Sequence, residues 1–488
     1  MKAFLEREFK LQAPPGFRLP DLPGDQLPPR VFTSIYYDTA HHRLARRAMT
    51  LRCRSERRRP RWQLKLPRGA ARLELTVPGG AGVPPEELTR LLVAATRGGA
   101  LVPIATLRTR RAGVRVRDLD GSVVEVVLDT VAVLEQGRVV RRFREIEGEL
   151  LTGDEAILER IRPVLRAAGA VDGDGRAKVF QALGIEPPPV TTPDASSAAL
   201  DHVRAMLQAQ VDSVLIHDPG VRLGTEPEEL HQMRVAVRRL RAILRATGPM
   251  FEREWVESLR EELAWLGDAL GSVRDLDVLH EYLRQEITAT DPAERRAGRR
   301  LLRRLEAERT HARTELMQAL GDARYFALLD RLEGAIEQPK VVESDFPLRE
   351  VAAREFKKLR KAVEALPGVP SDETLHEIRI KGKRARYAAE LVRTMAGKPA
   401  ERFIAKVKEL QDVLGEHQDA LVAEARIRAL AGGLGGGRTN FMAGRLVERQ
   451  RARRDAARAA FAALWPKLAR RGEKAWRKGW ADTARTTP

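Results

Sequence analysis

The chain has 488 residues, of which 43% are hydrophobic and 32% are charged. This length is too great for a single hydrophobic core, and the composition is typical of a soluble, folded protein of two or three domains. The formal net charge of +19 favours a polyanionic partner, such as nucleic acid, an acidic membrane surface or a phosphate polymer. Because Cys53 is the only cysteine, an intramolecular disulfide is excluded and a reducing compartment is expected.

The chain begins with MKAFLEREFK, which carries charges where a signal peptide needs an apolar segment. Along the sequence, no apolar run approaches the roughly 18 residues that a membrane-spanning helix requires. We therefore expect a cytoplasmic protein that has no membrane partner.

Two regions with different patterns follow one another in the sequence. The first is rich in predicted strands, namely RVFTSIYYDT, MTLRCRSE, RWQLKLP, ARLELTV, SVVEVVLDT and RRFREIEGEL, with helices near residues 84–96 and 153–168. Residues 184–197, rich in Pro, Thr and Ser, are predicted to form a linker. Beyond the linker, stretches such as EELHQMRVAVRRLRAIL place apolar residues at spacings of three and four, which predicts long helices.

Charged side chains alternate with apolar ones along the predicted strands. In FLEREFKL, residues 4–11, an extended strand places Glu6, Glu8 and Lys10 on one face. The same spacing recurs at Arg52 and Arg54, Gln63 and Lys65, Arg72 and Glu74, Arg111, Arg115 and Arg117, Glu125 and Asp129, and Glu145, Glu147 and Glu149. A solvated face would explain one such strand, whereas six of them predict a β-barrel with a charged interior. Carboxylates hold hard divalent cations, and Arg and Lys hold phosphate oxygens, so this interior fits a metal-bound oligophosphate.

The ordered motifs of this region carry a family resemblance. EREFK matches a Glu-x-Glu-x-Lys signature, and YYDT, LRCR, QLK, VVLDT, EIEGEL and RAKVF follow it in order. Residues 1–183 thus resemble the CYTH domain of the triphosphate tunnel metalloenzymes, which include inorganic triphosphatases, thiamine triphosphatases and class IV adenylate cyclases. The resemblance implies a closed antiparallel β-barrel, the tunnel, with flanking helices and with Mg²⁺ or Mn²⁺ as cofactor.

The resemblance also implies roles for individual residues. The expected metal ligands are Glu6, Glu8, Asp129, Glu145 and Glu147. The expected phosphate contacts are Lys10, Arg52, Arg54, Lys65, Arg111, Arg115 and Lys178, with Arg108 and Arg110 as alternatives in register to Arg111. The expected catalytic set is Glu6, Glu8, Lys10 and Glu74, in which Lys10 contributes charge and Glu74 is a candidate to polarise the attacking water. Two departures from the family are Gln63, where Thr is common, and Thr76, where some members have an acid that serves as a further metal ligand.

The predicted helical region contains an internal duplication. ELHQMRVAVRRLRAIL begins at Glu229 and TLHEIRIKGKRARYAAEL at Thr374, and the later phrases LGSVRD and LGEHQD are separated by nearly the same number of residues. His231, Arg234, Arg238 and Arg241 in the first copy align with His376, Arg379, Lys383 and Arg386 in the second. Steps of three and four place each set along one helical stripe, where the like charges repel one another. A bound anion would relieve that repulsion.

These helical motifs resemble the CHAD domain, a helical domain named for its histidines and associated with polyphosphate binding. The resemblance covers residues 198–470, with repeats at about 198–335 and 346–470 and a tail at 471–488, and it implies an all-α domain of two duplicated helical bundles. The expected polyphosphate contacts are His231, Arg234, Arg238, Arg241, Arg274, His376, Arg379, Lys383, Arg386 and His417. The histidines could instead bind a metal, but their Arg and Lys neighbours would repel a cation. Asp419 is a candidate to orient His417.

The sequence therefore predicts a metal-dependent inorganic triphosphatase connected to a module that binds long-chain polyphosphate. The expected partners are triphosphate and polyphosphate, in a cytoplasmic location that includes polyphosphate granules. The alternatives for the tunnel are adenylate cyclase activity, thiamine triphosphatase activity and non-catalytic binding of polyphosphate. Nucleic acid is a less favoured partner, because aromatic residues for base stacking are only 5% of the chain.

Overall fold

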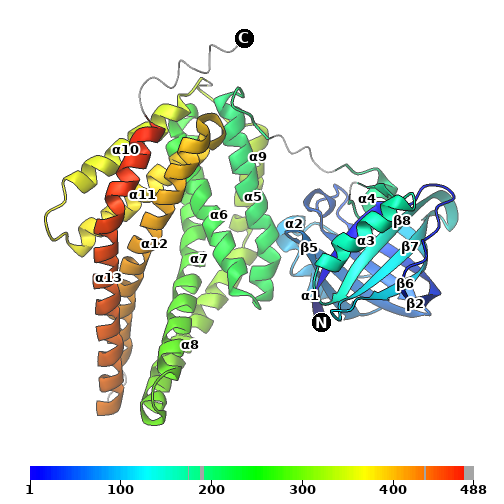
Figure 1. Ribbon diagram of the computed structural model, residues 1–488, viewed down its shortest axis with the longest axis horizontal. Helices are drawn as coiled ribbons and strands as arrows, with labels where there is room; N and C mark the ends of the chain where they lie inside the picture. The colour runs from blue at the N-terminus through cyan, green and yellow to red at the C-terminus, as the bar shows by residue number, and fades with distance from the viewer. Residues whose placement is uncertain (174, 187–191, 344, 433–435, 477–488) are drawn as a thin grey trace. The chain divides into compact units, whose positions relative to one another are not determined.

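The computed structural model describes residues 1–173, 175–186, 192–343, 345–432 and 436–476 (Figure 1). It divides into two compact units, the first mostly residues 1–190 and the second mostly residues 191–488. Parts of the predicted linker 184–197 and of the predicted tail 471–488, together with residues 433–435, lie outside the described residues.

Nine strands occur among the described residues of the first unit, and their apolar and polar residues alternate as predicted. They are β1 (Lys2–Gln12), β2 (Gly24–Asp38), β3 (Thr50–Glu56), β4 (Arg59–Arg68), β5 (Ala71–Pro78), β6 (Val102–Arg117), β7 (Val123–Glu135), β8 (Arg138–Thr152) and β9 (Val171–Asp172). The helices of this unit are α1 (Glu86–Thr89), α2 (Val93–Thr96), α3 (Ala156–Ala167) and α4 (Lys178–Leu183).

The strands close into a barrel because β1 pairs with both β5 and β8. The order around the barrel is β1, β5, β4, β3, β2, β6, β7, β8 and back to β1, with every pair antiparallel, and β9 adds to β1 as an extra strand. A closed sheet has one set of alternate residues facing inward and the other facing outward. The predicted closed antiparallel barrel with flanking helices is confirmed.

The outward-facing apolar residues are covered by the helices, so most of the hydrophobic core of this unit lies outside the barrel. Phe9 on β1 packs with Ile157 and Leu165 of α3. On the other side, Leu64 of β4 packs with Leu88 of α1. This arrangement leaves the inward face free for charged residues.

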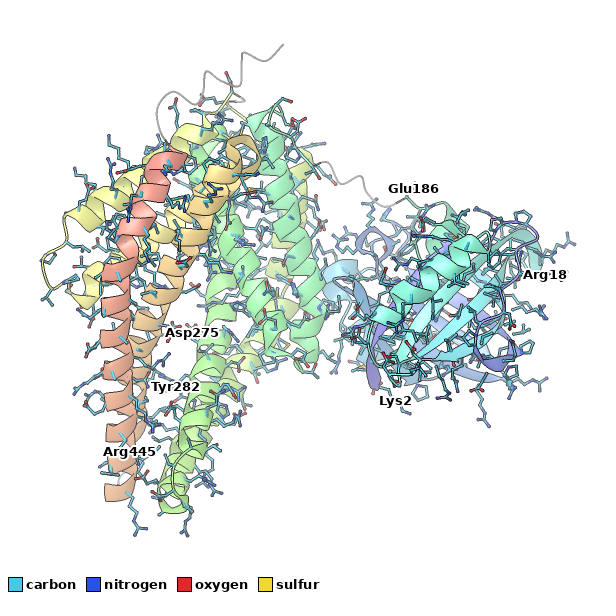
Figure 2. The ribbon with its side chains drawn as sticks, in the orientation of Figure 1. Lys2, Arg18, Glu186, Asp275, Tyr282 and Arg445 are labelled. Carbon is cyan, nitrogen blue, oxygen red and sulfur yellow. The ribbon has the colours of Figure 1, made fainter. Side chains whose placement is uncertain are left out.

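Helix α4 packs against one end of the barrel, which we call the α4 end. Val179 and Phe180 belong to one buried cluster with Tyr36 and Leu107. The opposite end is formed by the beginning of β1 and the β3–β4 hairpin, and we call it the far end. Figure 2 labels Lys2 at the far end and Glu186, which follows α4, at the other.

The second unit consists of helices in the part that the structure describes. They are α5 (Ala199–Leu223), α6 (Pro227–Ala246), α7 (Arg253–Thr288), α8 (Pro292–Gly321), α9 (Ala323–Glu337), α10 (Leu348–Glu364), α11 (Asp372–Leu391), α12 (Arg393–Gly432, with a non-helical residue at Gly397) and α13 (Gly437–Ala475). Apolar residues at spacings of three and four are buried, as in Leu230, Met233, Val237 and Leu240 of α6.

The duplication in the sequence is visible in the helices. The first repeat places its two motifs on α6 and α7, and the second places them on α11 and α12. Figure 1 shows α7 with α8 and α12 with α13 as two long helical hairpins, and Leu283, Leu301, Ile427 and Leu446 from the four helices join in one buried cluster. The predicted all-α domain of two related bundles is confirmed. None of the helices in the described ranges is long and apolar enough to cross a membrane.

Candidate functional site

Strand register brings the predicted acidic residues together inside the barrel. Asp129 on β7 is directly opposite Glu145 on β8, and Glu147 on β8 is opposite Lys10 on β1. Asp129, Glu145 and Glu147 are all buried, and each can place one carboxylate oxygen within 4.8 Å of the others. Three buried carboxylates at this separation could hold a hard divalent cation.

Lys178 on α4 reaches into this acidic group, which we call the triad (Asp129, Glu145, Glu147). Its Nζ lies 3.0 Å from Asp129 Oδ2 and 2.7 Å from Glu147 Oε1, and it also contacts Glu145. Burial disfavours the charged ammonium, but these carboxylates outweigh burial and raise the pKa of Lys178 well above its usual value. Helix α4 thus supplies a permanent positive charge at one end of the barrel interior.

Of the three register candidates Arg108, Arg110 and Arg111, the one whose side chain faces inward is Arg111. Its guanidinium donates two hydrogen bonds to Asp129, 2.8 Å and 2.6 Å long, and another of 2.5 Å to Glu147. Arg108 and Arg110 are an odd number of positions from Arg111 on β6, so their side chains point to the outer face, where both are exposed.

A second group of carboxylates is formed by Glu6, Glu8 and Glu149. Glu8 is directly opposite Glu149 across the β1–β8 pair. Burial and the nearby charge of Glu6 raise the pKa of Glu149 to about 7, against the opposing effect of Lys65. Glu149 belongs to the alternating pattern of its strand, but that pattern alone predicts no role for it.

Basic residues pair with these acids. Lys65 Nζ lies 2.5 Å from Glu6 Oε1 and 3.4 Å from Glu74 Oε2. Lys10 Nζ lies 3.3 Å from Glu8 Oε1 and 3.1 Å from Glu147 Oε1, which belongs to the triad. Burial raises the pKa of Glu8, but Lys10 and other cations outweigh it, so the net shift is downward.

Glu74 is held by the two residues at which this sequence departs from the family pattern. Gln63 Nε2 donates to Glu74 Oε1 at 2.5 Å, and Thr76 Oγ1 donates to the same oxygen at 3.2 Å. Gln63 also accepts a 2.9 Å hydrogen bond from Arg52 Nε. Gln63 and Thr76 therefore belong to the interior network and position a carboxylate.

The remaining predicted phosphate contacts extend along the interior. Arg52 Nη1 donates to the Tyr36 hydroxyl at 3.1 Å. The Arg54 guanidinium lies over the Phe32 ring at 3.5 Å, and burial together with the charges of Arg52 and Arg111 lowers the pKa of Arg54 to about 9. A guanidinium in this environment would gain from an anionic partner.

Arg115 lies nearer the far end than the other predicted contacts. It is 38% exposed, and it bonds to Glu125 at 2.6 Å rather than to the triad. The aromatic residues Tyr37 and Trp62 do not face the interior. They are buried in the outer core, with ring centroids 4.8 Å apart, as expected for core residues.

In the helical unit, the two basic stripes face each other and form one group. Arg238 on α6 donates from Nε to the Tyr387 hydroxyl on α11 at 2.9 Å. Burial and the charges of Arg379, Arg238 and Arg234 lower the pKa of Lys383 to about 7. We call Arg234, Arg238, Arg379 and Lys383 the shared cluster, because each repeat contributes half of it.

Each repeat also contributes an aspartate from its second motif, and this aspartate lies near an arginine of the shared cluster. Arg234 bonds to Asp275 of α7 at 2.9 Å, and Figure 2 labels Asp275 on that helix. In the other repeat, burial lowers the pKa of Arg379, and the carboxylate of Asp419 on α12 opposes this shift. Asp419 therefore lies near Arg379 of the shared cluster, whereas the carboxylate beside His417 Nε2 is that of Asp372.

The predicted histidines have different environments. Burial and the charge of Arg274 lower the pKa of His231, and His376 Nδ1 lies 2.7 Å from Gln418 Oε1. The His417 side chain is only 1% exposed, and its Nε2 lies 3.0 Å from Asp372 Oδ1. A phosphate chain on the surface has no direct access to His417.

The last predicted pair also differs between the repeats. Arg241 is exposed, whereas the Arg386 side chain is 11% exposed and lies 3.3 Å from Glu390. The equivalent positions on α6 and α11 are therefore not equally available to a ligand.

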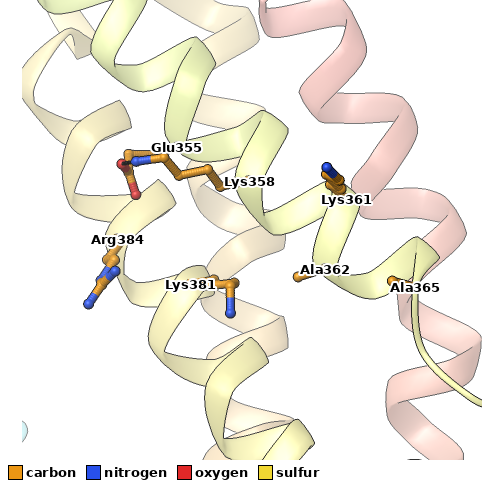
Figure 3. Close-up of a pocket in the computed structure, with 7 residues that line it drawn as sticks. All are labelled: Glu355, Lys358, Lys361, Ala362, Ala365, Lys381 and Arg384. Atoms are coloured by element: carbon orange, nitrogen blue, oxygen red, sulfur yellow. Dashed lines mark hydrogen bonds and ion pairs between the residues drawn. The ribbon is translucent and has the colours of Figure 1, made fainter.

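A separate basic depression of about 340 Å³ lies on α10 and α11 (Figure 3), lined by Glu355, Lys358, Lys361, Ala362, Ala365, Lys381 and Arg384. Lys358 bonds to Glu355 at 2.7 Å, and Lys381 bonds to Glu377 at 3.1 Å. Lys381 is two residues from Lys383 and so points to the other side of α11. The depression is therefore distinct from the shared cluster.

Comparisons with known proteins identify two domains in the chain. The CYTH domain model matches residues 5–167, and the CHAD domain model matches residues 205–428. An uncharacterized protein of Mycobacterium tuberculosis, Rv2226, is 30% identical in an alignment of 438 positions that covers 83% of this chain and 83% of that protein.

Two solved structures resemble the separate parts. The CHAD domain from the plant Ricinus communis is 26% identical, with a TM-score of 0.48, over 56% of this chain and 95% of that chain. The putative adenylyl cyclase HpAC1 from Hippeastrum, for which a dominant triphosphatase activity is described, is 17% identical, with a TM-score of 0.23, over 38% of this chain and 97% of that chain. The two domain models and the relative from Mycobacterium tuberculosis show that the chain belongs to the family of proteins in which a CYTH domain is fused to a CHAD domain.

Proposed function

We propose that the barrel hydrolyses inorganic triphosphate with Mg²⁺ or Mn²⁺, and that the helical unit binds long-chain polyphosphate. The observation that carries the first part is the meeting of buried carboxylates and buried cations inside one closed barrel. A site for a free metal needs only the acids, and a site for a free anion needs only the bases. A metal-bound oligophosphate needs both.

The donor set fits a hard divalent cation, because the triad offers three carboxylate oxygens within 4.8 Å of one another and no sulfur ligand. Glu6 and Glu8, the other expected ligands, lie in the second group (Glu6, Glu8, Glu149), where Glu8 is opposite Glu149 across the strand pair. Mg²⁺ or Mn²⁺ held there would neutralise charge on the oligophosphate and polarise a water for attack. Because Glu149 holds a proton at neutral pH more readily than an ordinary carboxyl, the repulsion within its group is reduced before a cation binds.

When the substrate binds, the basic residues would exchange their carboxylate partners for phosphate oxygens. Lys10, Lys65 and Arg111 bond to carboxylates in the structure, and a triphosphate would offer them oxygens of the same charge and geometry. The cations hold the substrate and offset the charge that develops on the departing phosphate, which is the main requirement of phosphoryl transfer. Neither a nucleophilic side chain nor a covalent intermediate is needed.

The proposal for the helical unit rests on the shared cluster. Four cations from two helices, with the pKa of Lys383 lowered by its neighbours, repel one another in the absence of an anion. A polyphosphate chain has a regular series of charges and can contact all four at once, with each further contact made intramolecularly. A short triphosphate reaches fewer of them.

The test of the catalytic proposal is a double substitution, Glu6→Gln with Glu8→Gln. The amides keep the shape of the carboxylates but bind hard cations far more weakly, so metal-dependent phosphate release should be lost. The matched control is Glu155→Gln with Glu159→Gln at the exposed start of α3, which should leave activity unchanged. Full activity in the Glu6 and Glu8 variant would contradict the assignment.

A further inference from the structure

The β3–β4 hairpin at the far end of the barrel has an unusual turn. Glu56 pairs with Arg59, so the loop consists of Arg57 and Arg58 alone. Both are in the left-handed region, with φ of 50° and 60°. A two-residue turn with both residues at positive φ favours Asn-Gly, Asp-Gly or Gly-Gly, because other side chains are strained there.

Two arginines thus occupy positions where glycine or asparagine would be more stable. Backbone strain of this kind is enriched at functional sites. The next residues, Arg59 and Arg61, are also exposed. The hairpin therefore presents four cations in five residues, with a proline between the last two.

The basic residues of the interior lead toward this hairpin. Arg54 belongs to β3, and its pKa is lowered partly by Arg61 on β4. Among the described residues, the buried Nε of Arg54 has no hydrogen-bond partner. Arg61 lies 3.8 Å from Glu56 and is 46% exposed, so the positive charges continue from the buried interior to the surface.

We propose that the β3–β4 hairpin and Arg61 form an outer phosphate-binding site at the far end of the barrel. It would hold phosphate units that extend beyond those inside the tunnel. The substrate class of the tunnel then includes linear inorganic phosphate chains longer than triphosphate, entered from one chain end. This inference rests on the proposed function, because it extends the phosphate path of the same site.

The kinetic test uses full-length protein with Arg57→Asn and Arg58→Gly, which gives the favoured Asn-Gly turn and removes both charges. We expect KM for long-chain polyphosphate to rise about tenfold or more, with KM and kcat for triphosphate changed less than about twofold. The control is Arg138→Gln with Arg142→Gln, two exposed arginines on β8, which should leave KM and kcat unchanged for both substrates. Equal effects on the two substrates, or no effect on the long chain, would overturn the outer site.

A second measurement does not depend on hydrolysis. Phenylglyoxal modifies accessible arginines, and peptide mass spectrometry reports Arg57 and Arg58 separately from the rest of the chain. Long-chain polyphosphate should protect them and triphosphate should not, and protection should persist when Arg379 and Lys383 are both changed to Glu. If catalysis is absent but this protection is seen, the proposed activity fails and the outer site stands. Lack of protection, or protection by 5′-triphosphorylated RNA but not by polyphosphate, would refute the outer site.

Discussion

Polyphosphate binding by the helical unit should depend on pH through Lys383. In the free protein, burial and the charges of Arg379, Arg238 and Arg234 lower the pKa of this lysine to about 7, from an ordinary value of 10.5. Asp419 is the nearby acid that opposes the shift. At pH values above about 7, much of Lys383 is therefore neutral before a ligand binds.

The direction of this pH dependence follows from the charge of the ligand. A bound polyanion favours the protonated lysine and raises its pKa, so binding above pH 7 takes up a proton. Affinity should therefore increase as pH falls toward about 7 and then level off. With one proton taken up per site, the slope is at most about tenfold in affinity, or 1.36 kcal/mol, per pH unit.

The matched variant is Lys383→Arg, which keeps a cation that remains charged over this range. It should bind polyphosphate with little dependence on pH, and more tightly than the unmodified protein above pH 8. Calorimetry at constant ionic strength, repeated in two buffers of different ionisation enthalpy, measures both the affinity and the proton uptake. If the affinity of the unmodified protein does not vary with pH, or if the Lys383→Arg variant shows the same pH dependence as the unmodified protein, this role of Lys383 is refuted.

Three further outcomes are expected. Lys65→Ala should weaken triphosphate binding by about 1.5–3 kcal/mol in calorimetry, the range for a hydrogen bond to a charged group, and unchanged affinity would mean that the side chain makes no contact. Arg234→Glu with Arg238→Glu should remove most polyphosphate binding, because the repeats share one cluster; retention of half the binding free energy would indicate two independent sites. Gly113→Ala should destabilise the barrel by about 1–3 kcal/mol in thermal unfolding, because its Cβ would lie 2.2 Å from the Val126 carbonyl oxygen, and an unchanged melting temperature would contradict this packing.

The sequence was sufficient to predict the charged barrel interior, because alternation along a strand is a local property. Glu6, Glu8 and Lys10 share a face in any extended conformation. Which residue lies opposite which is set by strand register, and register depends on the closure of the whole sheet. The roles of Glu149 and of the Gln63 contact with Glu74 could therefore not be predicted from spacing alone.

The helical unit shows the same limit. The stripes on the two repeats were predicted from helical periodicity, but their convergence depends on how α6 packs against α11. Periodicity within each copy therefore does not predict that the two stripes form one shared cluster. Likewise, His417 is paired with Asp372, which is distant in sequence, rather than with its neighbour Asp419. Long-range packing, rather than local pattern, decides these partners.

The central claim is tested most directly by measuring phosphate release from triphosphate, long-chain polyphosphate, ATP and thiamine triphosphate, each with Mg²⁺, with Mn²⁺ and with a chelator. We expect metal-dependent release from inorganic triphosphate, little from ATP or thiamine triphosphate, and none with the chelator. Equal release with the chelator, preferred hydrolysis of ATP or thiamine triphosphate, or no release from any substrate would contradict the account.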